Sequence, residues 1–353
     1  MLARLVTENF RNLEPLAWEA GAGRHLLLGD NGSGKTSVLE AIYLLATTRS
    51  FRAANLLDCC RAGTTRFLLR GDVSGNVRTT LAIEWSSRIR RRTLNGKTVS
   101  LTEHVSALPV LAWTAAEATL LTGAPTARRR FLDRGLITAR PGALDALQRY
   151  REALLQKRQL LQTGGEEIGA WNDILAELGA VVIQLRSSYL ARLRRAFEEV
   201  LTAAESRFAG TELVYKPSPV EGAEGAQAFR ARLERSVGTE RARRLPLLGP
   251  HRDEVTVLWR GQEIRRIASA GERKLLGLSL LAAQARLVAE DDRAPLVLLD
   301  DADAELDRKA LARAWRGFLS LPQLFASSNR PEVFEGLDIT RRWHLEEGRL
   351  SGT

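Results

Sequence analysis

Residues Gly29 to Thr36 have the types and the spacing of a loop that binds phosphate. They read GDNGSGKT and fit the pattern G-x-x-x-x-G-K-[ST]. Glycines let backbone N–H groups turn toward phosphate oxygens, and the N-terminus of a following helix attracts an anion. Lys35 would reach the β- and γ-phosphates, and the Thr36 hydroxyl would bind Mg²⁺. The sequence therefore predicts an ATP site made of Gly29, Asp30, Asn31, Gly32, Ser33, Gly34, Lys35, Thr36 and the adjacent Ser37.

A second pattern, residues 296–301, is an apolar run that ends in two carboxylates and reads LVLLDD. A buried strand would place Asp300 at its carboxyl end, where it can hold Mg²⁺ together with Thr36. Asp301 could then orient or deprotonate the attacking water, so Asp301 and Lys35 are the predicted catalytic residues. A strand followed by acidic turn residues is common, and the pattern gains its weight from the phosphate loop.

A third pattern, SAGERK at residues 269–274, precedes an apolar helix and has two interpretations. Ser269 followed by Glu272 is a capping box, which is a purely structural device. Ser269 and Gly271 also fit a signature motif of the ABC type, in which a helix N-terminus binds the γ-phosphate held by another subunit. Both interpretations stay open, because a capped helix N-terminus is also an anion site.

The elements that must position these residues follow from periodicity. Residues 24–28 predict a strand that ends at the phosphate loop, and a helix follows Thr36. Residues 66–115 are rich in short strands, with a hairpin turn at 94–97. Residues 127–208 favour helices, and 144–161 and 175–200 are separated by two glycines. Residues 216–225 predict a loop, 255–259 and 296–299 strands, and 270–290 a helix.

These elements predict an α/β fold with a mainly helical lobe inserted into it. The ATP-binding lobe is expected at residues 1–115 and 245–353, and the helical lobe at 116–244. The helix at 269–290 is open to packing with either lobe.

Composition limits the partners. The chain has 353 residues and a net charge of +10, and a basic balance favours a polyanion only where the charges cluster. Arginines cluster at residues 88–92, 128–130, 192–195 and 241–244. We predict DNA binding, with Arg128, Arg129 and Arg130 as candidate contacts. No apolar run reaches the length of a membrane span, and the two cysteines are adjacent, so we expect a reducing, cytoplasmic setting.

The order of further motifs makes a family recognisable. The chain resembles the RecF family, relatives of the SMC and Rad50 ATPases that lack the long coiled coils. The resemblance covers nearly the whole length and rests on NFRN at residues 9–12, the phosphate loop, TRSFR at 48–52, GAPTARRRFLD at 123–133, GPHRD at 249–253, the Ser269 motif and LLDDADAELD at 298–307. The strings at 128–133 and 249–253 are more specific than the phosphate loop.

The resemblance implies an ABC-type P-loop ATPase head with a helical second lobe. It also implies an ATP-driven homodimer with Mg²⁺ as cofactor and binding of single-stranded and gapped or junction DNA. It further implies partners of the RecR and RecO type, loading of recombinase at gaps during repair, replication and the SOS response, and slow ATP hydrolysis as a timer.

Two departures and two alternatives accompany this interpretation. Glu272 stands where the family usually has Gln, and residues 325–329 read FASSN, so no histidine can act as the switch residue of ABC transporters. One alternative is a DNA clamp or scaffold that ATP switches with negligible turnover, and the retained Asp301 argues against it. The other is a transport ATPase subunit, which the missing histidine and the arginine clusters disfavour.

Overall fold

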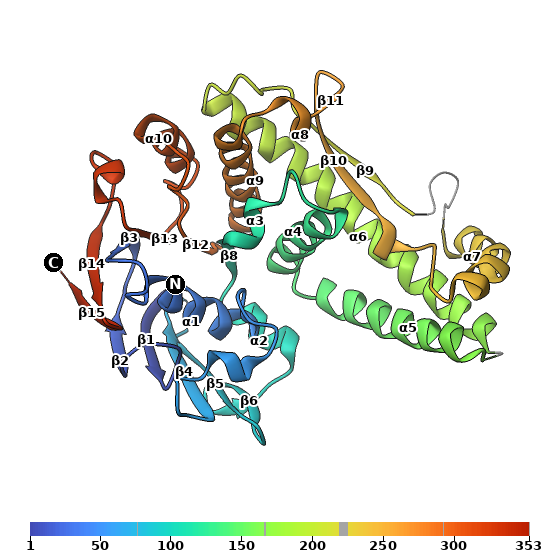
Figure 1. The fold of residues 1–353 in the computed structure, drawn as a ribbon, viewed down its shortest axis with the longest axis horizontal. Helices are drawn as coiled ribbons and strands as arrows, with labels where there is room; N and C mark the ends of the chain where they lie inside the picture. Colours follow the sequence, from blue (N-terminus) through green and yellow to red (C-terminus); the bar gives the residue numbers. More distant parts are fainter. Residues whose placement is uncertain (76, 166, 219–224, 292, 353) are drawn as a thin grey trace. The chain divides into compact units, whose positions relative to one another are not determined.

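The computed structural model describes residues 1–75, 77–165, 167–218, 225–291 and 293–352, and the chain divides into two compact units (Figure 1). Unit 1 comprises Met1–Leu120, Ala196–Ala209 and Ala268–Thr353, and unit 2 comprises Leu121–Arg195 and Gly210–Ile267. Both ends of the chain therefore belong to the same unit, as the sequence predicts.

Unit 1 contains two six-stranded sheets. The first has the order β2-β1-β4-β5-β6-β7 and is antiparallel throughout. Its strands are β1 (Leu2–Glu8), β2 (Leu16–Glu19), β4 (Arg66–Val73), β5 (Thr79–Ser86), β6 (Arg90–Leu94) and β7 (Lys97–Thr98).

The second sheet of unit 1 has the order β15-β14-β3-β13-β12-β8, and all its neighbours are parallel except β14 and β15. Strands β12 and β13 are buried along their whole length. For β12, this burial explains the continuous apolar run. The strands are β3 (Gly23–Leu28), β8 (Val110–Trp113), β12 (Leu296–Leu299), β13 (Gln323–Ser328), β14 (Arg341–Glu346) and β15 (Arg349–Gly352).

Helix α1 (Lys35–Thr47) contacts strands of both sheets. Nearly every residue of α1 is buried, so its apolar residues lie on all sides of the helix and do not form a single face. The other helices of unit 1 are α2 (Leu101–Ala107), α3 (Ala115–Ala118), α9 (Ala270–Glu290) and α10 (Arg308–Arg316), with short 3-10 turns η1 (Leu56–Cys59) and η3 (Pro331–Phe334).

Helix α9 belongs to unit 1 and contacts β8, α3 and α10. Gly277 allows the close approach, because a Cβ there would lie 2.5 Å from the ring of Trp113. This resolves the question that the sequence leaves open: the 269–290 helix packs with the nucleotide lobe and not with the helical one.

Unit 2 is built from helices and a three-stranded antiparallel sheet of order β11-β10-β9. Its elements are α4 (Pro125–Ala139), α5 (Ala143–Thr163), most of α6 (Ile168–Ala203), β9 (Glu212–Lys216), α7 (Gly225–Arg243), η2 (Pro250–Arg252), β10 (Glu254–Trp259), β11 (Gln262–Glu263) and α8 (Ile264–Ile267). A small core joins α5, α6 and α7 around Tyr150, Leu175, Val182 and Phe229. Of the loop predicted at 216–225, residues 219–224 lie outside the described part of the chain.

The units differ from the expected lobes in two places. Residues 245–267 belong to unit 2, because β10 pairs with β9. Residues 196–209 belong to unit 1, because α6 runs past the end of unit 2 and Val200 packs beside Gly317.

Helix α6 has the length and apolarity that could cross a membrane, with a mean hydropathy of 1.3 over its best window. No such segment is expected from the sequence alone. The same helix carries core residues of the protein, including Leu175, Val182 and Phe197, and a buried arginine, Arg186, that pairs with carboxylates. We therefore interpret α6 as a core helix.

Candidate nucleotide site

The loop between β3 and α1 has the backbone of a phosphate cradle. Gly29, Gly32 and Gly34 have φ angles of 147°, 84° and 114°, a region that side chains with a Cβ rarely adopt. At Gly29 a Cβ would also lie 2.2 Å from the carbonyl oxygen of Leu345. These glycines are needed for the path of the chain, and the pattern that predicts the loop reflects this requirement.

The donors of the loop suit an anion. No side chain caps the first turn of α1 and no acidic residue lies in it, so its N–H groups are open to a ligand. Lys35 is 6% exposed, and its ammonium donates to the carbonyl oxygens of Gly29 (2.6 Å) and Asp30 (2.8 Å). Within the described residues, the buried hydroxyl of Ser33 has no hydrogen-bond partner. A phosphate group would supply the acceptor that Ser33 lacks.

Asp300 follows β12 and lies against the start of α1. Its Oδ1 accepts hydrogen bonds from the hydroxyls of Thr36 (2.9 Å) and Ser327 (2.8 Å). Burial raises the pKa of Asp300, and the two hydroxyls oppose that effect. The Asp300 carboxylate and the Thr36 hydroxyl together provide two hard oxygen ligands, and this donor set fits Mg²⁺.

Asp301 begins the loop between β12 and α10 and has a φ of 46°, which is uncommon for a residue other than glycine. Its N–H donates to the Ser327 hydroxyl at 3.1 Å, and its carbonyl oxygen accepts from the Lys274 ammonium at 3.0 Å. Its carboxylate is exposed at the end of the strand. The backbone of Asp301 is thus fixed while its side chain stays available.

The Ser269 motif forms the capping box. The Ser269 hydroxyl accepts from the N–H of Glu272 at 3.3 Å, and the Glu272 carboxylate accepts from the Ser269 N–H at 2.9 Å. Ser269 is exposed, and in the described chain no hydrogen bond joins it or Gly271 to residues 29–37. Lys274 instead ties the start of α9 to the loop after β12, through the carbonyl oxygens of Asp301 and Ala304. The structure brings Lys35, Thr36, Asp300 and Asp301 together and leaves Ser269 and Gly271 outside that group.

Two supporting residues carry no role in the sequence analysis. Asn12 donates to the carbonyl oxygen of Gly32 at 2.8 Å and accepts from the Ser37 hydroxyl at 2.7 Å, so it connects the middle of the phosphate loop to the first turn of α1. Ser37 is therefore directed at Asn12. Glu40 is fully buried in α1 and accepts hydrogen bonds from Arg11 (2.8 Å) and Ser50 (2.5 Å). In the sequence, these contacts are indicated only by the motifs at 9–12 and 48–52, which contain Asn12, Arg11 and Ser50.

The end of β13, where a switch histidine is missing, contacts the loop after β12 and the phosphate loop. Ser327 holds Asp300, and the Ser328 hydroxyl donates to the buried carboxylate of Asp303 at 2.8 Å. The amide of Asn329 lies 3.4 Å from the side-chain oxygen of Asn31 in the phosphate loop. Asn329 is therefore the residue after β13 that lies beside the phosphate loop.

Of the predicted DNA contacts Arg128, Arg129 and Arg130, two have structural partners within unit 2. Arg128 donates to the carboxylate of Glu254 at 2.7 Å and to the carbonyl oxygen of Gly123 at 2.9 Å. Arg129 donates to the carbonyl oxygen of Asp253 at 2.6 Å. Arg130 alone of the three is exposed. The sequence interpretation of this cluster as a DNA contact is therefore weakened for Arg128 and Arg129.

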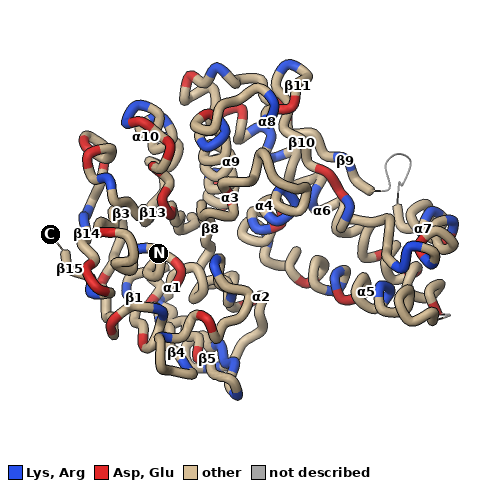
Figure 2. The backbone as a smooth tube through the Cα atoms, viewed as in Figure 1, with Lys and Arg blue, Asp and Glu red and all other residues tan. Residues whose placement is uncertain are grey.

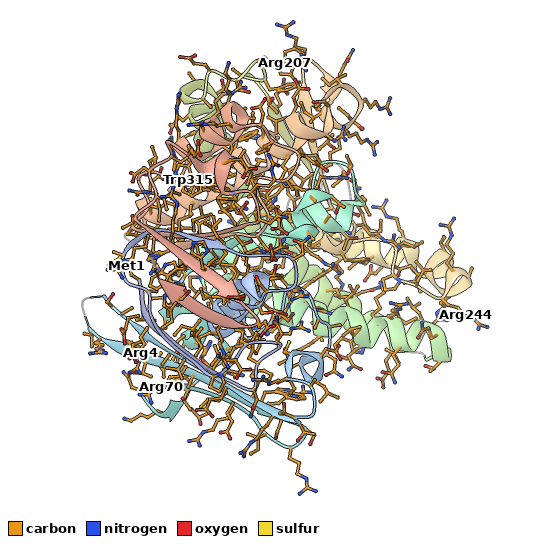
Figure 3. The ribbon with its side chains drawn as sticks, turned by 60° about the vertical axis from the view of Figure 1, so that its left-hand side comes forward. Met1, Arg4, Arg70, Arg207, Arg244 and Trp315 are labelled. Carbon is orange, nitrogen blue, oxygen red and sulfur yellow. The ribbon has the colours of Figure 1, made fainter. Side chains whose placement is uncertain are left out.

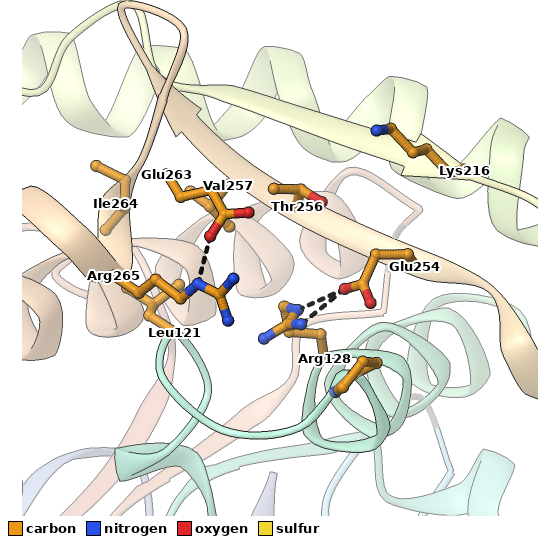
Figure 4. Close-up of a pocket in the computed structure, with 10 residues that line it drawn as sticks. Leu121, Arg128, Lys216, Glu254, Thr256, Val257, Glu263, Ile264 and Arg265 are labelled. Carbon is orange, nitrogen blue, oxygen red and sulfur yellow. Dashed lines mark hydrogen bonds and ion pairs between the residues drawn. The ribbon is translucent and has the colours of Figure 1, made fainter.

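Arg128 also lines a pocket of about 280 Å³ within unit 2 (Figure 4). The pocket lies between the start of α4 and the strands β10 and β11, and its charges are mixed. Arg128 faces Glu254, and Arg265 forms an ion pair with Glu263. Two carboxylates face the two arginines, and Lys216 is the remaining cation of the lining, so the pocket has only a weak preference for an anion.

The other arginine clusters differ in exposure. Arg88, Arg90 and Arg91 are exposed at the β5–β6 edge, where Figure 2 shows basic residues together. Residues 241–244 are exposed at the end of α7, and within 192–195 the Arg194 side chain donates to the carbonyl oxygen of Leu213. The exposed clusters are the better candidates for a polyanion.

Unit 2 has its own buried polar cluster, centred on Arg186 of α6. Its guanidinium bonds Asp133 of α4 at 2.8 Å and Asp253 at 2.7 Å. Burial alone raises the pKa of Asp253, and the donors Arg186, Tyr215 and the Ser218 N–H oppose this effect. Burial works to lower the pKa of Arg186, but the two carboxylates outweigh it and raise that pKa. The two most specific strings in the sequence supply Asp133 and Asp253, so those strings build the core of unit 2.

Comparison with known proteins agrees with this geometry. The family model described as the RecF/RecN/SMC N-terminal domain matches residues 1–349. A protein named DNA replication and repair protein RecF from Chlorobium luteolum is 33% identical over 325 residues, which cover 87% of this chain and 88% of that protein. A protein of the same name from Moorella thermoacetica is 31% identical over 360 residues, covering 99% and 95%.

Solved structures show the same fold. A structure of the recombination mediator protein RecF with ATP, described as part of the RecFOR pathway, has a TM-score of 0.88 and 23% identity and covers 100% of this chain and 97% of its own. The Smc head domain from Pyrococcus furiosus has a TM-score of 0.57 and 15% identity and covers 100% and 95%. The expected ABC-type head fold is confirmed.

Proposed function

Because the chain belongs to the RecF family of DNA replication and repair proteins, we propose that it is an ATP-dependent DNA-binding protein of recombinational repair. The observation that carries this proposal is the 2.9 Å contact between Thr36 and Asp300 beside a glycine loop with an uncapped helix behind it. Phosphate donors and a pair of oxygen ligands for a divalent cation meet there.

The residues divide the work of binding a nucleotide. The N–H groups of the loop and of the first turn of α1 bind phosphate oxygens, and Lys35 exchanges its two carbonyl partners for the β- and γ-phosphates. Thr36 and Asp300 would hold Mg²⁺, which lowers the negative charge of the terminal phosphates when it is bound. Asn12 keeps the loop in shape from outside.

Hydrolysis requires a positioned water, and Asp301 is the residue placed for it. The water oxygen forms a bond to the γ-phosphorus while the bond from that phosphorus to the β,γ-bridging oxygen breaks, and the water proton passes to the Asp301 carboxylate. The products are ADP and phosphate. The Asp301 backbone is hydrogen-bonded to Ser327 and Lys274, so the Cα from which its side chain extends is held in position.

We further propose a homodimer that closes on ATP. Lys35 of one copy and Ser269 of the other would share one nucleotide, since Ser269 is exposed, Gly271 is partly exposed and neither is hydrogen-bonded to residues 29–37 in the described chain. Two such sites arise at once about a two-fold axis. ATP favours the closed state because only there does the γ-phosphate gain the second set of donors.

The DNA and partner assignments follow the family. The name of the structural relative places it in the RecFOR pathway. For this chain we propose binding to single-stranded DNA and to gaps or junctions, cooperation with proteins of the RecR and RecO type, a cytoplasmic location and a role in the SOS response. The exposed arginines at 88–91 and 241–244 would supply phosphate contacts.

Calorimetry of Lys35→Ala tests the nucleotide site. We expect ATP affinity to fall at least about 30-fold, because charge-assisted contacts to phosphate contribute about 2–3 kcal/mol. Ser37→Ala is a milder control, since its hydroxyl contacts Asn12. Unchanged ATP affinity in Lys35→Ala would remove the loop from consideration as the site.

Light scattering with Mg²⁺ and nucleotide tests the dimer. ATP should convert monomer to dimer and ADP should not. Asp301→Asn should hydrolyse ATP slowly and stay dimeric. Ser269→Arg should bind ATP and stay monomeric, because its own loop is intact and the surface it offers to a second copy is blocked. Dimerisation of Ser269→Arg at the unmodified level would reduce Ser269 to a helix cap.

A further inference from the structure

An ion pair stands at the exposed start of α9, between Arg207 and Glu272. Glu272 is the third residue of the helix, and its carboxylate accepts from the Ser269 N–H at 2.9 Å and from the Ser269 hydroxyl at 3.0 Å. The hydrogen bond from the Ser269 N–H is the largest cause that lowers the pKa of Glu272, and the hydrogen bonds from Arg207 and from the Ser269 hydroxyl lower it further. The helix start that presents Ser269 therefore also presents a negative charge.

This charge conflicts with the proposed closed dimer. There the start of α9 receives the terminal phosphate of an ATP molecule held by a second copy. A carboxylate bonded directly to Ser269 would repel that phosphate, and a site shielded from water would strengthen the repulsion. The conflict needs a cation at the same place.

Arg207 supplies the cation and is held in position. Its Nη2 lies 2.7 Å from Oε1 of Glu272. Its guanidinium also lies 4.5 Å from the ring centroid of Phe208, which is 3% exposed and thus anchored in unit 1. The Arg207 side chain is 60% exposed, and a guanidinium has five N–H donors, so donors remain turned toward solvent (Figure 3).

We propose that Arg207 is a positioning residue of the shared site: by pairing with Glu272 it cancels the negative charge beside Ser269 and lets the start of α9 accept the γ-phosphate of ATP bound to a second copy of the chain. This inference rests on the proposed function and adds a residue to it. Arg207 follows the end of α6, 65 positions from Glu272 in the sequence, and no motif includes it.

The test measures the dimer dissociation constant by light scattering with Mg²⁺ and ATP. Arg207→Ala should weaken the dimer about tenfold or more, since an uncompensated like charge then faces the phosphate. Its ATP affinity as a monomer, measured by calorimetry at low protein concentration, should match that of the unmodified protein. Arg207→Lys should keep most of the dimer affinity, because the charge remains.

The double variant Arg207→Ala with Glu272→Gln separates charge from packing. Removing the carboxylate should restore the dimer to within about threefold of the unmodified protein, because no charge is left to cancel. Added salt should also reduce the defect of the single variant. Arg4→Ala is the matched control, since Arg4 has an exposed ion pair with Glu19 in the same unit and lies far from Arg207 in Figure 3.

Each result decides the proposal. It is overturned if Arg207→Ala dimerises like Arg4→Ala, or if the double variant stays as weak as the single one. If the unmodified protein fails to dimerise with ATP in the same experiment, the shared-site function itself fails, and the role of Arg207 fails with it.

Discussion

Asp253 in unit 2 and Asp300 in unit 1 are carboxylates with opposite surroundings. Asp253 in unit 2 is fully buried and bonded to the guanidinium of Arg186 at 2.7 Å. Asp300 in unit 1 meets only the hydroxyls of Thr36 and Ser327, and in the described part of the chain it forms no ion pair. A carboxylate that already has a cationic partner stabilises the fold, whereas a carboxylate without such a partner is suited to bind a metal cation.

The largest effect expected from this comparison is on the Arg186 cluster. Arg186→Ala leaves the carboxylates of Asp133 and Asp253 without their cation, and we expect the free energy of unfolding to fall by about 3–5 kcal/mol. Chemical denaturation measures it. The control is Arg149→Ala, whose exposed pair with Asp145 at 4.0 Å should be worth less than about 0.5 kcal/mol. Equal losses in the two variants would mean that the cluster is not structural.

Acid should weaken both units through histidines whose pKa is lowered, of which His251 in unit 2 and His25 in unit 1 have the largest shifts. Burial lowers the pKa of His251 in unit 2 and of His25 in unit 1 to about 4. A folded-state pKa below the ordinary 6.5 means that unfolding takes up a proton, so stability is lost as the pH falls from 6.5 through 4. Each histidine contributes at most about 3 kcal/mol.

The variants His251→Gln and His25→Gln assign this acid sensitivity. In each, the fall in unfolding free energy between pH 6.5 and 4, followed by denaturation, should become smaller than in the unmodified protein. His251 has a further structural role, because its ring lies 2.8 Å from the hydroxyl of Tyr150, so His251→Gln should also be less stable at pH 7. An unaltered pH profile in both variants would show that neither histidine carries the effect.

The smallest expected effect is on the salt dependence of DNA binding. It compares exposed arginines with arginines that are hydrogen-bonded within unit 2. Replacing the exposed Arg241, Arg243 and Arg244 by Gln should reduce the slope of log K for DNA against log salt by about 0.9 for each duplex phosphate that these side chains neutralise. Replacing Arg128 and Arg129 should leave the slope unchanged and reduce stability, because both donate within unit 2. Salt titration of DNA binding checks both, and the reverse pattern would restore the 128–130 cluster as the DNA contact.

The sequence predicts the part of the site that lies in continuous strings. The loop of residues 29–36 and the strand before Asp300 follow from local patterns with a known mechanism, and the structure places Thr36 next to Asp300 although 264 positions separate them. Ser327 and Arg207 could not be found this way, because a serine in a strand or an arginine in a loop has no pattern of its own and gains its role only from packing. Asn12 lies in the motif at 9–12, but that motif does not say which residues Asn12 contacts.

The fold was predictable to a similar depth. Apolar periodicity identifies α1, α6 and the buried strands, but not which strand pairs with which. Residues 254–259 resemble the strands of the nucleotide lobe, yet they pair with 212–216 in unit 2. Likewise, the specificity of the strings at 128–133 and 249–253 reflects the Arg186 cluster and its packing, and specificity alone does not distinguish a core from a site.

The most direct test compares the thermal midpoints of Asp253→Asn and Asp300→Asn with and without Mg²⁺ and ATP. Asp253→Asn should unfold several degrees below the unmodified protein, roughly 2–4 °C for each kcal/mol lost, and should still be stabilised by the nucleotide. Asp300→Asn should unfold at or above the unmodified midpoint, because within the described residues its side chain meets only hydroxyls and has no ion pair to lose. It should gain little from Mg²⁺ and ATP. Asp300 is thus assigned to the ligand and Asp253 to the fold. This assignment would be contradicted if Asp300→Asn were strongly destabilised and still stabilised fully by the nucleotide, while Asp253→Asn were stable and not stabilised by it.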